Sequence, residues 1–249
     1  TIQSQGQYDT YDTTPQDVIT SADFDQKIIT GTITMTDLEA NQNRGKEQII
    51  PLMRAKMEVL KTSFDNFFGD QMLSDGTGNG GLDLGGLALL VADDPTTGTV
   101  GGINRATSGN EFWRNQLYDF SVESVTPSAT TIQSSMNVLY RLCQTQGGQL
   151  IDLITAGDTY FGFYEDSLQA NQRFTDGSLA KLGFDALKYK AADVVYDTKC
   201  SDTRMYFLNT KFLSYKYIGD AMMSVGTATR PHNQGVTIVP MTSMGNLTI

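Results

Sequence analysis

The chain has 249 residues, with 28 acidic and 18 basic side chains, a formal net charge of −10 and a pI near 4.5. This charge argues against a sequence-specific nucleic-acid-binding protein, which normally presents a basic face. It does not exclude a container that encloses nucleic acid without binding it tightly. No run of 18 apolar residues is present, so we expect no membrane span. The N-terminus lacks a basic and then apolar signal pattern, and we expect a soluble protein used without secretion.

Residues 1–42 are predicted to form an extended β-hairpin. Apolar and polar side chains alternate from Phe24 to Met35, with β-branched threonines between them. The segment from Tyr8 to Ile19 is expected to supply the partner strand, with Pro15 at an edge or bend. A two-stranded ribbon is only marginally stable alone. We therefore expect it to lie on a neighbouring subunit; a hairpin folded onto its own domain is the alternative.

The stretch from Asn43 to Phe68 is predicted to be one long amphipathic helix, a spine. Its apolar side chains recur every three or four positions, which places them on one face that we expect to be a buried seam. These side chains are Ile49, Met53, Met57, Leu60, Phe64 and Phe67. Asn43 is expected to be the N-cap. Pro51 predicts a bend near Glu47–Pro51, because proline removes a backbone donor inside a helix.

The region after the spine is predicted to be rich in turns. Residues 76–86 contain six glycines but no Gly-Lys-Ser/Thr, so we expect turns and not a phosphate loop. Leu87 to Val91 predicts a short buried strand or helical turn. Asp93 and Asp94 lack a third cation ligand at suitable spacing, which favours a solvated turn over a metal site. Trp113 is either an interface anchor or a core residue.

A second unit is predicted from about Ser128. Hydroxyl caps precede an amphipathic helix with Ile132 and Cys143 on its apolar face, and Gly147-Gly148 is expected to end it. We expect a strand at 150–155 and a helix from Asp158 to follow, then one strand at 188–197 and another at 205–218, separated by a turn, and a β-prone tail at 236–249. The tail is predicted to be a strand that returns to the first unit. This order indicates an α/β or α+β domain, with helices against a sheet.

No catalytic, cofactor or metal site is predicted. Cys143 and Cys200 have no metal-ligand spacing, and we expect Cys143 to be a small buried hydrophobe and a disulfide to be absent. His232 is the sole histidine, and nothing around it supplies the base and orienting partner of a triad. HExxH, paired CxxC, GxSxG and Rossmann patterns are absent from the sequence. The sequence gives no positive reason to expect an enzyme.

Several phrases in a fixed order resemble the major capsid proteins of tailed double-stranded DNA bacteriophages, which have the Johnson fold. They are DLEANQN before the spine, GGINRAT, FWRNQ, and the spacing from VVYD to YFLN, so the resemblance spans essentially the whole chain. It implies an α+β fold with an extended β-hairpin loop at 1–42, a peripheral domain with the spine helix at 43–128, an axial α/β domain at 129–220 and a return to the peripheral domain at 221–249. It also implies further residues beyond both ends. Some relatives crosslink a loop lysine to an asparagine; Lys27 and Asn246 are available, but no motif identifies the assisting glutamate, so the crosslink is not carried over.

The resemblance implies a coat protein that self-assembles into hexamers and pentamers of an icosahedral virion shell around phage DNA, built in the host bacterial cytoplasm. It implies as partners other copies of the chain, double-stranded DNA held non-specifically, and scaffolding, portal and decoration proteins, with no membrane. Candidate inter-subunit contacts are Lys27, Glu39, Arg44, Arg54, Lys61, Trp113 and Arg114. One alternative is an encapsulin-like nanocompartment shell of the same fold. Another is a stand-alone enzyme or glycan-binding domain built on the second unit, which predicts a compact monomer or dimer.

Overall fold

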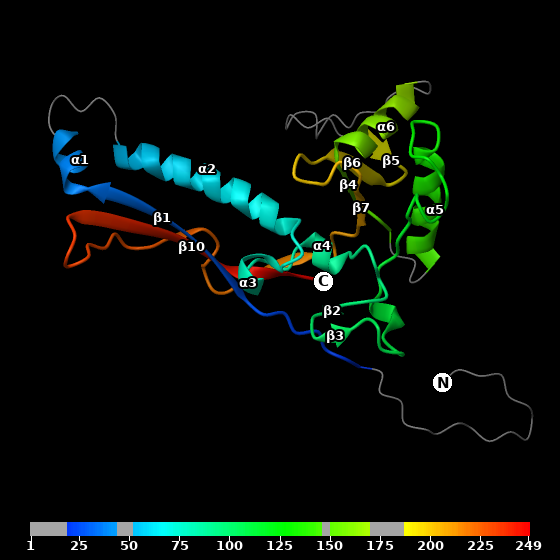
Figure 1. Cartoon of the computed structure of the whole chain (residues 1–249), viewed down its shortest axis with the longest axis horizontal. Helices are drawn as coiled ribbons and strands as arrows, with labels where there is room; N and C mark the ends of the chain where they lie inside the picture. The colour runs from blue at the N-terminus through cyan, green and yellow to red at the C-terminus, as the bar shows by residue number, and fades with distance from the viewer. Residues whose placement is uncertain (1–18, 44–51, 146–149, 170–186) are drawn as a thin grey trace, which may run out of the picture.

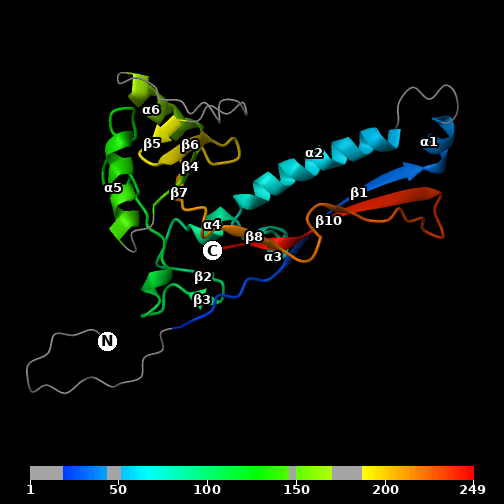
Figure 2. The same ribbon diagram turned by 180° about the vertical axis from the view of Figure 1, so that it is seen from behind.

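The computed structural model describes residues 19–43, 52–145, 150–169 and 187–249, and it has a mixed α+β fold with several sheets. A long arm projects from the remainder of the chain (Figures 1 and 2). We define the arm as strand β1 (Lys27–Thr36), helices α1 (Asp37–Gln42) and α2 (Leu52–Met72), and the part of strand β10 (Val236–Thr248) that pairs with β1. The other described residues are the body.

Strands β1 and β10 form an antiparallel ribbon of ten residue pairs that begins with Lys27 opposite Gly245. Successive side chains of a strand point to opposite faces. Ile29 and Ile33 are therefore buried on the face toward α2, while the threonines between them are exposed. Beyond the end of β1, strand β10 pairs with β8 (Ser214–Tyr217), and β9 (Ser224–Val225) lies against its middle. The predicted strand at 24–35 and the predicted return of the tail are confirmed.

The described partner of β1 is not the strand that the sequence led us to expect. Residues 1–18 lie outside the described residues, so most of the predicted partner strand cannot be placed, and Ile19 is exposed and belongs to no strand. The strand that pairs with β1 is β10, from the other end of the chain. Because β1 also lies along α2, it is supported within its own chain, as in the alternative considered above, and contact with a neighbouring subunit stays a prediction. The domain boundaries at 42, 128 and 220 stay predictions.

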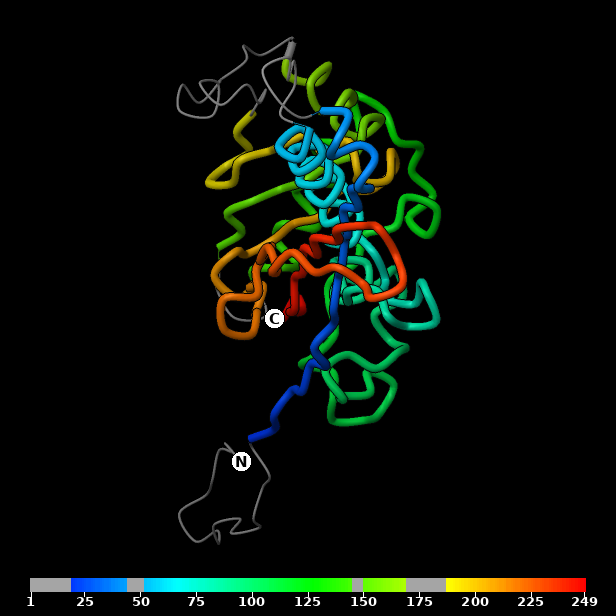
Figure 3. The backbone as a smooth tube through the Cα atoms, turned by 90° about the vertical axis from the view of Figure 1, so that its left-hand side faces the viewer, coloured from blue at the N-terminus to red at the C-terminus, as the bar shows by residue number. Residues whose placement is uncertain are grey.

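Helix α2 lies over one face of the ribbon, as the view along the arm shows (Figure 3). The approach is closest at Gly31, where an added Cβ would lie 2.9 Å from Leu60 Cδ1. Phe64 and Gln71 are the only buried residues of this 21-residue helix. The predicted buried seam is confirmed at Phe64 and only partly elsewhere: Met53, Met57 and Leu60 are half-buried, and Ile49 lies outside the described residues. Phe67 is 42% exposed, and Phe68 packs instead, edge-on against the Tyr215 ring at 5.1 Å between centroids. A ribbon only two strands wide covers a narrow strip of a helix.

The tip of the arm is held by α1 and one lysine. A capping box begins α1: the Glu39 N–H donates to Thr36 Oγ1 at 3.2 Å, and the Thr36 N–H donates to Glu39 Oε2 at 3.0 Å. Lys56 Nζ of α2 donates to Glu39 Oε2 at 3.0 Å and to the Thr34 carbonyl at 3.1 Å. These bonds tie the end of β1 to α2. They also hold the pKa of Glu39 below its usual value, with the Lys56 hydrogen bond as the main cause.

Asn43 does not begin the spine helix as predicted. Its N–H donates to the Glu39 carbonyl at 3.1 Å, so it ends α1 instead. The predicted bend near Glu47–Pro51 lies outside the described residues, and α2 is described only from Leu52.

A four-stranded sheet and two helices build the second unit of the body. The strands, in order across the sheet, are β5 (Leu187–Tyr189), β6 (Ala192–Tyr196), β4 (Leu153–Ala156) and β7 (Met205–Leu208). Strand β4 is parallel to β6 and antiparallel to β7. Helices α5 (Ile132–Thr145) and α6 (Asp158–Gln169) pack on one face, where buried side chains such as Ile132, Ile154 and Tyr164 form the largest core cluster. The two predicted helices and the predicted strand near 150–155 are confirmed. The predicted strands at 188–197 and 205–218 are each divided in two, and the second half of the latter, β8, pairs with β10 in the other sheet.

The opposite face of this sheet joins the body to the arm. Tyr206 and Leu208 of β7 are buried there with Leu90 and with Leu247 of β10. The remaining short elements are α3 (Gly78–Gly81), α4 (Leu87–Leu90), β2 (Thr99–Val100), β3 (Ile103–Asn104) and the 3₁₀ turn η1 (Glu111–Trp113). Among the helices of the described residues, none combines the length and apolar composition that crossing a membrane requires.

Removing the Phe64 ring is expected to loosen the arm and leave the body intact. The Phe64→Ala substitution should cost about 3 kcal/mol, because it empties a buried aromatic site, and amide hydrogen exchange should accelerate in α2 and β1 but not in α5. The matched control is Phe67→Ala, three residues along the same helix but exposed. Equal acceleration in both variants would show that Phe64 has no special role.

Alkaline pH is expected to unfold the second unit through two tyrosines. Burial raises the pKa of Tyr164 and Tyr189 to about 12, against about 10 in an unfolded chain. Their stabilisation is complete below pH 10 and is lost as the pH rises from 10 towards 12, because the unfolded state ionises first. Urea midpoints should fall less between pH 9 and 11.5 in Y164F/Y189F than in the parent. The exposed Tyr196→Phe variant should fall as the parent does.

Candidate functional site

The arm presents apolar side chains to solvent. Ile28 of β1 is 60% exposed, and Val59 of α2 is 67% exposed, while Leu38 of α1 and Phe67 of α2 are exposed as well. Single exposed apolar residues are ordinary on any surface. Here they lie on β1, α1 and α2, the three N-terminal elements of the arm. The arm is thin, so few buried side chains lie between its two faces. The arm surface is therefore the first candidate site, and its chemistry is that of a protein contact.

The structure places the predicted charged contact residues along the same arm. Arg54 lies 3.5 Å from Glu58 on the exposed side of α2, and Lys61 is exposed on that helix. Glu39 is engaged by Lys56, as described above. Lys27 Nζ donates to the Gly81 carbonyl at 2.6 Å, so this loop lysine is anchored within its own chain. Arg44 lies outside the described residues. Inter-subunit contact by these residues stays a prediction.

Trp113 and Arg114 form a clamp with Arg105 inside the body. The buried Arg105 guanidinium donates to the Leu90 carbonyl at 2.5 Å and to the Trp113 carbonyl at 3.2 Å. In return, Arg114 Nε donates to the Arg105 carbonyl at 2.9 Å, and the indole N–H of Trp113 donates to the Val100 carbonyl at 3.0 Å. Burial lowers the pKa of Arg105. The clamp explains physically why the GGINRAT and FWRNQ phrases belong together. Trp113 is half-buried against the cluster that contains Leu90 and Leu247, and its role as an interface contact stays a prediction.

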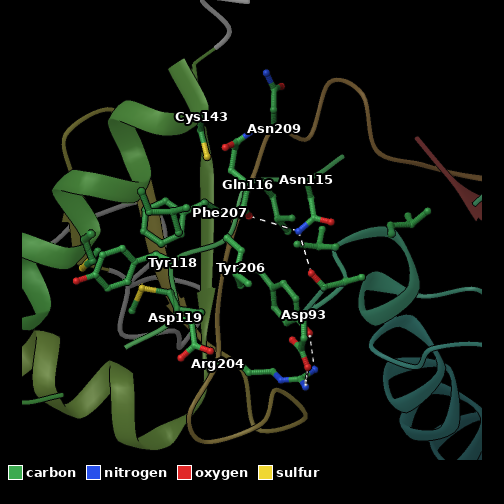
Figure 4. Close-up of a pocket in the computed structure, with 18 of the residues that line it drawn as sticks. Asp93, Asn115, Gln116, Tyr118, Asp119, Cys143, Arg204, Tyr206, Phe207 and Asn209 are labelled. Atoms are coloured by element: carbon green, nitrogen blue, oxygen red, sulfur yellow. Dashed lines mark hydrogen bonds and ion pairs between the residues drawn. The ribbon is translucent and has the colours of Figure 1, made fainter. Parts of the chain in front are cut away.

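An apolar cavity of about 850 Å³ lies between the 113–120 segment, α5 and β7 (Figure 4). Its walls are mostly rings and aliphatic side chains, including Phe120, Met136, Tyr206 and Phe207. The volume is within the range of small-molecule sites. No local pattern in the sequence indicated it, because its walls come from segments that are distant along the chain.

Polar side chains also line parts of this cavity. Arg204 is paired with Asp93, and Asn115 donates from Nδ2 to the Ala92 carbonyl at 2.9 Å. The Asn115 Oδ1 atom is buried and has no hydrogen-bond partner among the residues that the structure describes. Burial raises the pKa of Cys143, and burial followed by the nearby Asp119 carboxylate raises the pKa of Tyr160.

Within the described ranges, no three His, Cys, Asp or Glu side chains converge as metal ligands would. Asp93 is engaged by Arg204, and Asp94 accepts from Thr96 as in a solvated turn. Cys143 and Cys200 are free cysteines.

Comparison with known proteins gives only distant likeness. No family model matches the chain, and no curated protein does. One similar solved chain, titled "Mycobacterium phage Che8", has a TM-score of 0.46 and 11% identity over 88% of this chain, which spans 65% of that chain. Another, from "Satellite phage P4 procapsid including size determination (Sid) protein", has a TM-score of 0.48 and 10% identity over 100% of this chain and 75% of that one. Both TM-scores lie below 0.5.

Filling the cavity is expected to be tolerated. Leu139 lines it, so Leu139→Phe should leave the urea midpoint unchanged or raise it, because the added ring atoms enter open space. The control, Ile154→Phe, enlarges a fully buried side chain in the packed cluster of the same unit and should lose about 1–3 kcal/mol. Equal destabilisation of both variants would mean that the space is closed in solution.

Proposed function

We propose that this chain is a bacteriophage major capsid protein, which assembles into hexamers and pentamers of an icosahedral shell around packaged double-stranded DNA. Two lines of argument support the proposal. The ordered phrases of the sequence resemble that family along essentially the whole chain. Independently, the arm has the physical properties of an element that another protein must cover.

The incomplete burial of the arm is the observation that carries the proposal. Helix α2 has 21 residues but buries only Phe64 and Gln71. Buried apolar surface stabilises by about 25 cal/mol per Å², and apart from Phe64 the apolar side chains of this helix are only half-buried or exposed within the described chain. Val59 and Phe67 stay in solvent instead. An adjacent copy that covers these side chains would supply the missing burial, and repeated contacts of this kind strengthen a shell.

The structure changes how the arm would be used. Since β1 rests on its own α2 and pairs with β10, the ribbon does not need a neighbour to exist. The surface left for a neighbour is the outer side of α2 and the exposed face of the ribbon. Contacts between unlike surfaces of identical copies close into rings when the rotation permits, and rings are the units of a shell. In this scheme the chain has no enzymatic role, its place is the virion, and scaffolding, portal and decoration proteins would be further partners.

The charge of the chain is compatible with a container. A protein with a net charge of −10 neutralises few DNA phosphates and so releases few counterions. We therefore expect it to contact packaged DNA weakly and non-specifically. The same charge keeps free subunits apart at low ionic strength. Assembly should therefore be favoured by salt, which screens repulsion between copies.

Removing the exposed apolar side chains of the arm is expected to abolish assembly. The full chain should form rings or closed shells in negative-stain electron microscopy and sediment far faster than a monomer, whereas V59S/F67S should sediment as small species with an unchanged circular dichroism spectrum. The matched control is F112S/V122S, one exposed phenylalanine and one exposed valine on the body. A parent chain that remains small across salt and protein concentrations would contradict the shell, and a V59S/F67S variant that assembles normally would contradict the role of the arm.

A further inference from the structure

The hydrogen bonds of the ribbon show which edge of β1 is open. The Ile238 N–H and C=O of β10 both bond to Thr229, at 2.8 and 2.9 Å, and so point away from β1. Thr34 lies opposite Ile238, so its own N–H and C=O point away from β10, as required in an antiparallel ladder. In the same register, the Asp37 N–H donates to the Gly235 carbonyl at 2.9 Å. In β1, the backbone N–H and C=O groups of odd-numbered residues therefore point toward β10. Those of even-numbered residues point toward the opposite edge of the strand.

Two of the even-numbered residues have their edge groups partly occupied. The Thr34 carbonyl accepts from Lys56 Nζ, and the Thr36 N–H donates to Glu39. Ile28, Thr30 and Thr32 remain, with no backbone partner among the described residues on that edge. All three are exposed. The open edge thus presents three N–H donors and three C=O acceptors in alternation, centred on Thr30.

This edge has none of the usual protection against pairing. Exposed edge strands are normally blocked by a charged side chain, a proline or a bulge. From Ile28 to Thr36 the sequence IITGTITMT contains no charge and no proline, and the register with β10 is continuous. Lys56 occupies only the Thr34 carbonyl, at one end of this edge. An unblocked edge with regular spacing is a template for one more strand.

We propose that β1 pairs across this edge with β1 of a second copy, antiparallel about a twofold axis at Thr30. Ile28 then lies opposite Thr32 of the other copy, Thr30 opposite Thr30, and Thr32 opposite Ile28, which satisfies all six open groups of each copy with six hydrogen bonds. A second copy fits because the open groups are symmetric about Thr30, as a twofold contact requires, and because no like charges meet along the edge. The product is a four-stranded sheet in the order β10-β1-β1-β10, with two α2 helices on one face.

A proline at the centre of the edge tests this pairing. In Thr30→Pro the lost N–H is one that β10 does not use, so the ribbon within each copy should survive, as an edge strand tolerates proline. Thr30→Val keeps the N–H and the β-branched shape. In the full chain at assembly concentration, the Thr32 amide should exchange at least tenfold faster in Thr30→Pro than in Thr30→Val. Equal exchange rates in the two variants would overturn the proposal, as would protection of Thr32 that persists in dilute monomer, since that would come from a strand of the same chain.

Disulfide trapping tests the register. Directly opposed residues of a hydrogen-bonded antiparallel pair lie about 5.5 Å apart at Cα, within disulfide range. Mild oxidation of Thr30→Cys should give a covalent dimer on denaturing gels at several times the yield of Thr242→Cys, which lies opposite Thr30 within the same ribbon but away from the open edge. Equal yields would overturn the pairing. The dimer band is independent of particle size: shells without the Thr30→Cys dimer would refute this pairing alone, and the dimer without shells would refute the shell alone.

Discussion

The pairing of β1 with β10 is the constraint on which the arm depends. Without β10, strand β1 would be a single strand beside a helix, and a lone strand leaves its backbone groups unpaired on both edges. With β10 in place, the odd-numbered face of the ribbon buries Ile29 and Ile33, and Phe64 of α2 has a surface to pack on. The same strand then continues into the body, where Leu247 joins the cluster beneath β7. Strand β10 is therefore shared by the arm and the body and connects them.

The body and the arm differ in how they reach stability. The body buries both faces of its sheet, with two helices on one side and the Leu90 and Leu247 cluster on the other. The clamp of Arg105 adds donors for carbonyls that turns would leave unpaired, and such pairing matters most where water is excluded. The arm has a single helix over a two-stranded ribbon. Its outer faces are therefore the part of the molecule where contact with a partner gains most, while the body supplies a rigid base.

The sequence predicted the helices and strands of the body more completely than the packing of the arm, and the reasons are physical. The apolar spacing of Ile132 and Met136 predicted α5 because a helix on a sheet has one wide buried face. The pattern around β1 marked a strand but carried no information about its partner, which lies at the other end of the chain. The seam of α2 was overestimated, because periodicity gives the direction of an apolar face and not the width of the layer that covers it. The cavity had no sequence signal at all, since its walls meet only in three dimensions.

The distance along the chain between the two strands of the ribbon bears on how the protein is made. Thr36 pairs with Val236, so a ribosome must add 200 residues after β1 before its partner exists, roughly 10 to 40 s at 5–20 residues per second. During that interval the segment IITGTITM is uncharged, has high β-propensity and is unpaired on both edges. Nascent chains tend to aggregate through segments of this kind. Chaperone capture during translation would protect it. Only a chain synthesised as far as β10 can complete the arm, so prematurely terminated products are barred from any structure that requires it.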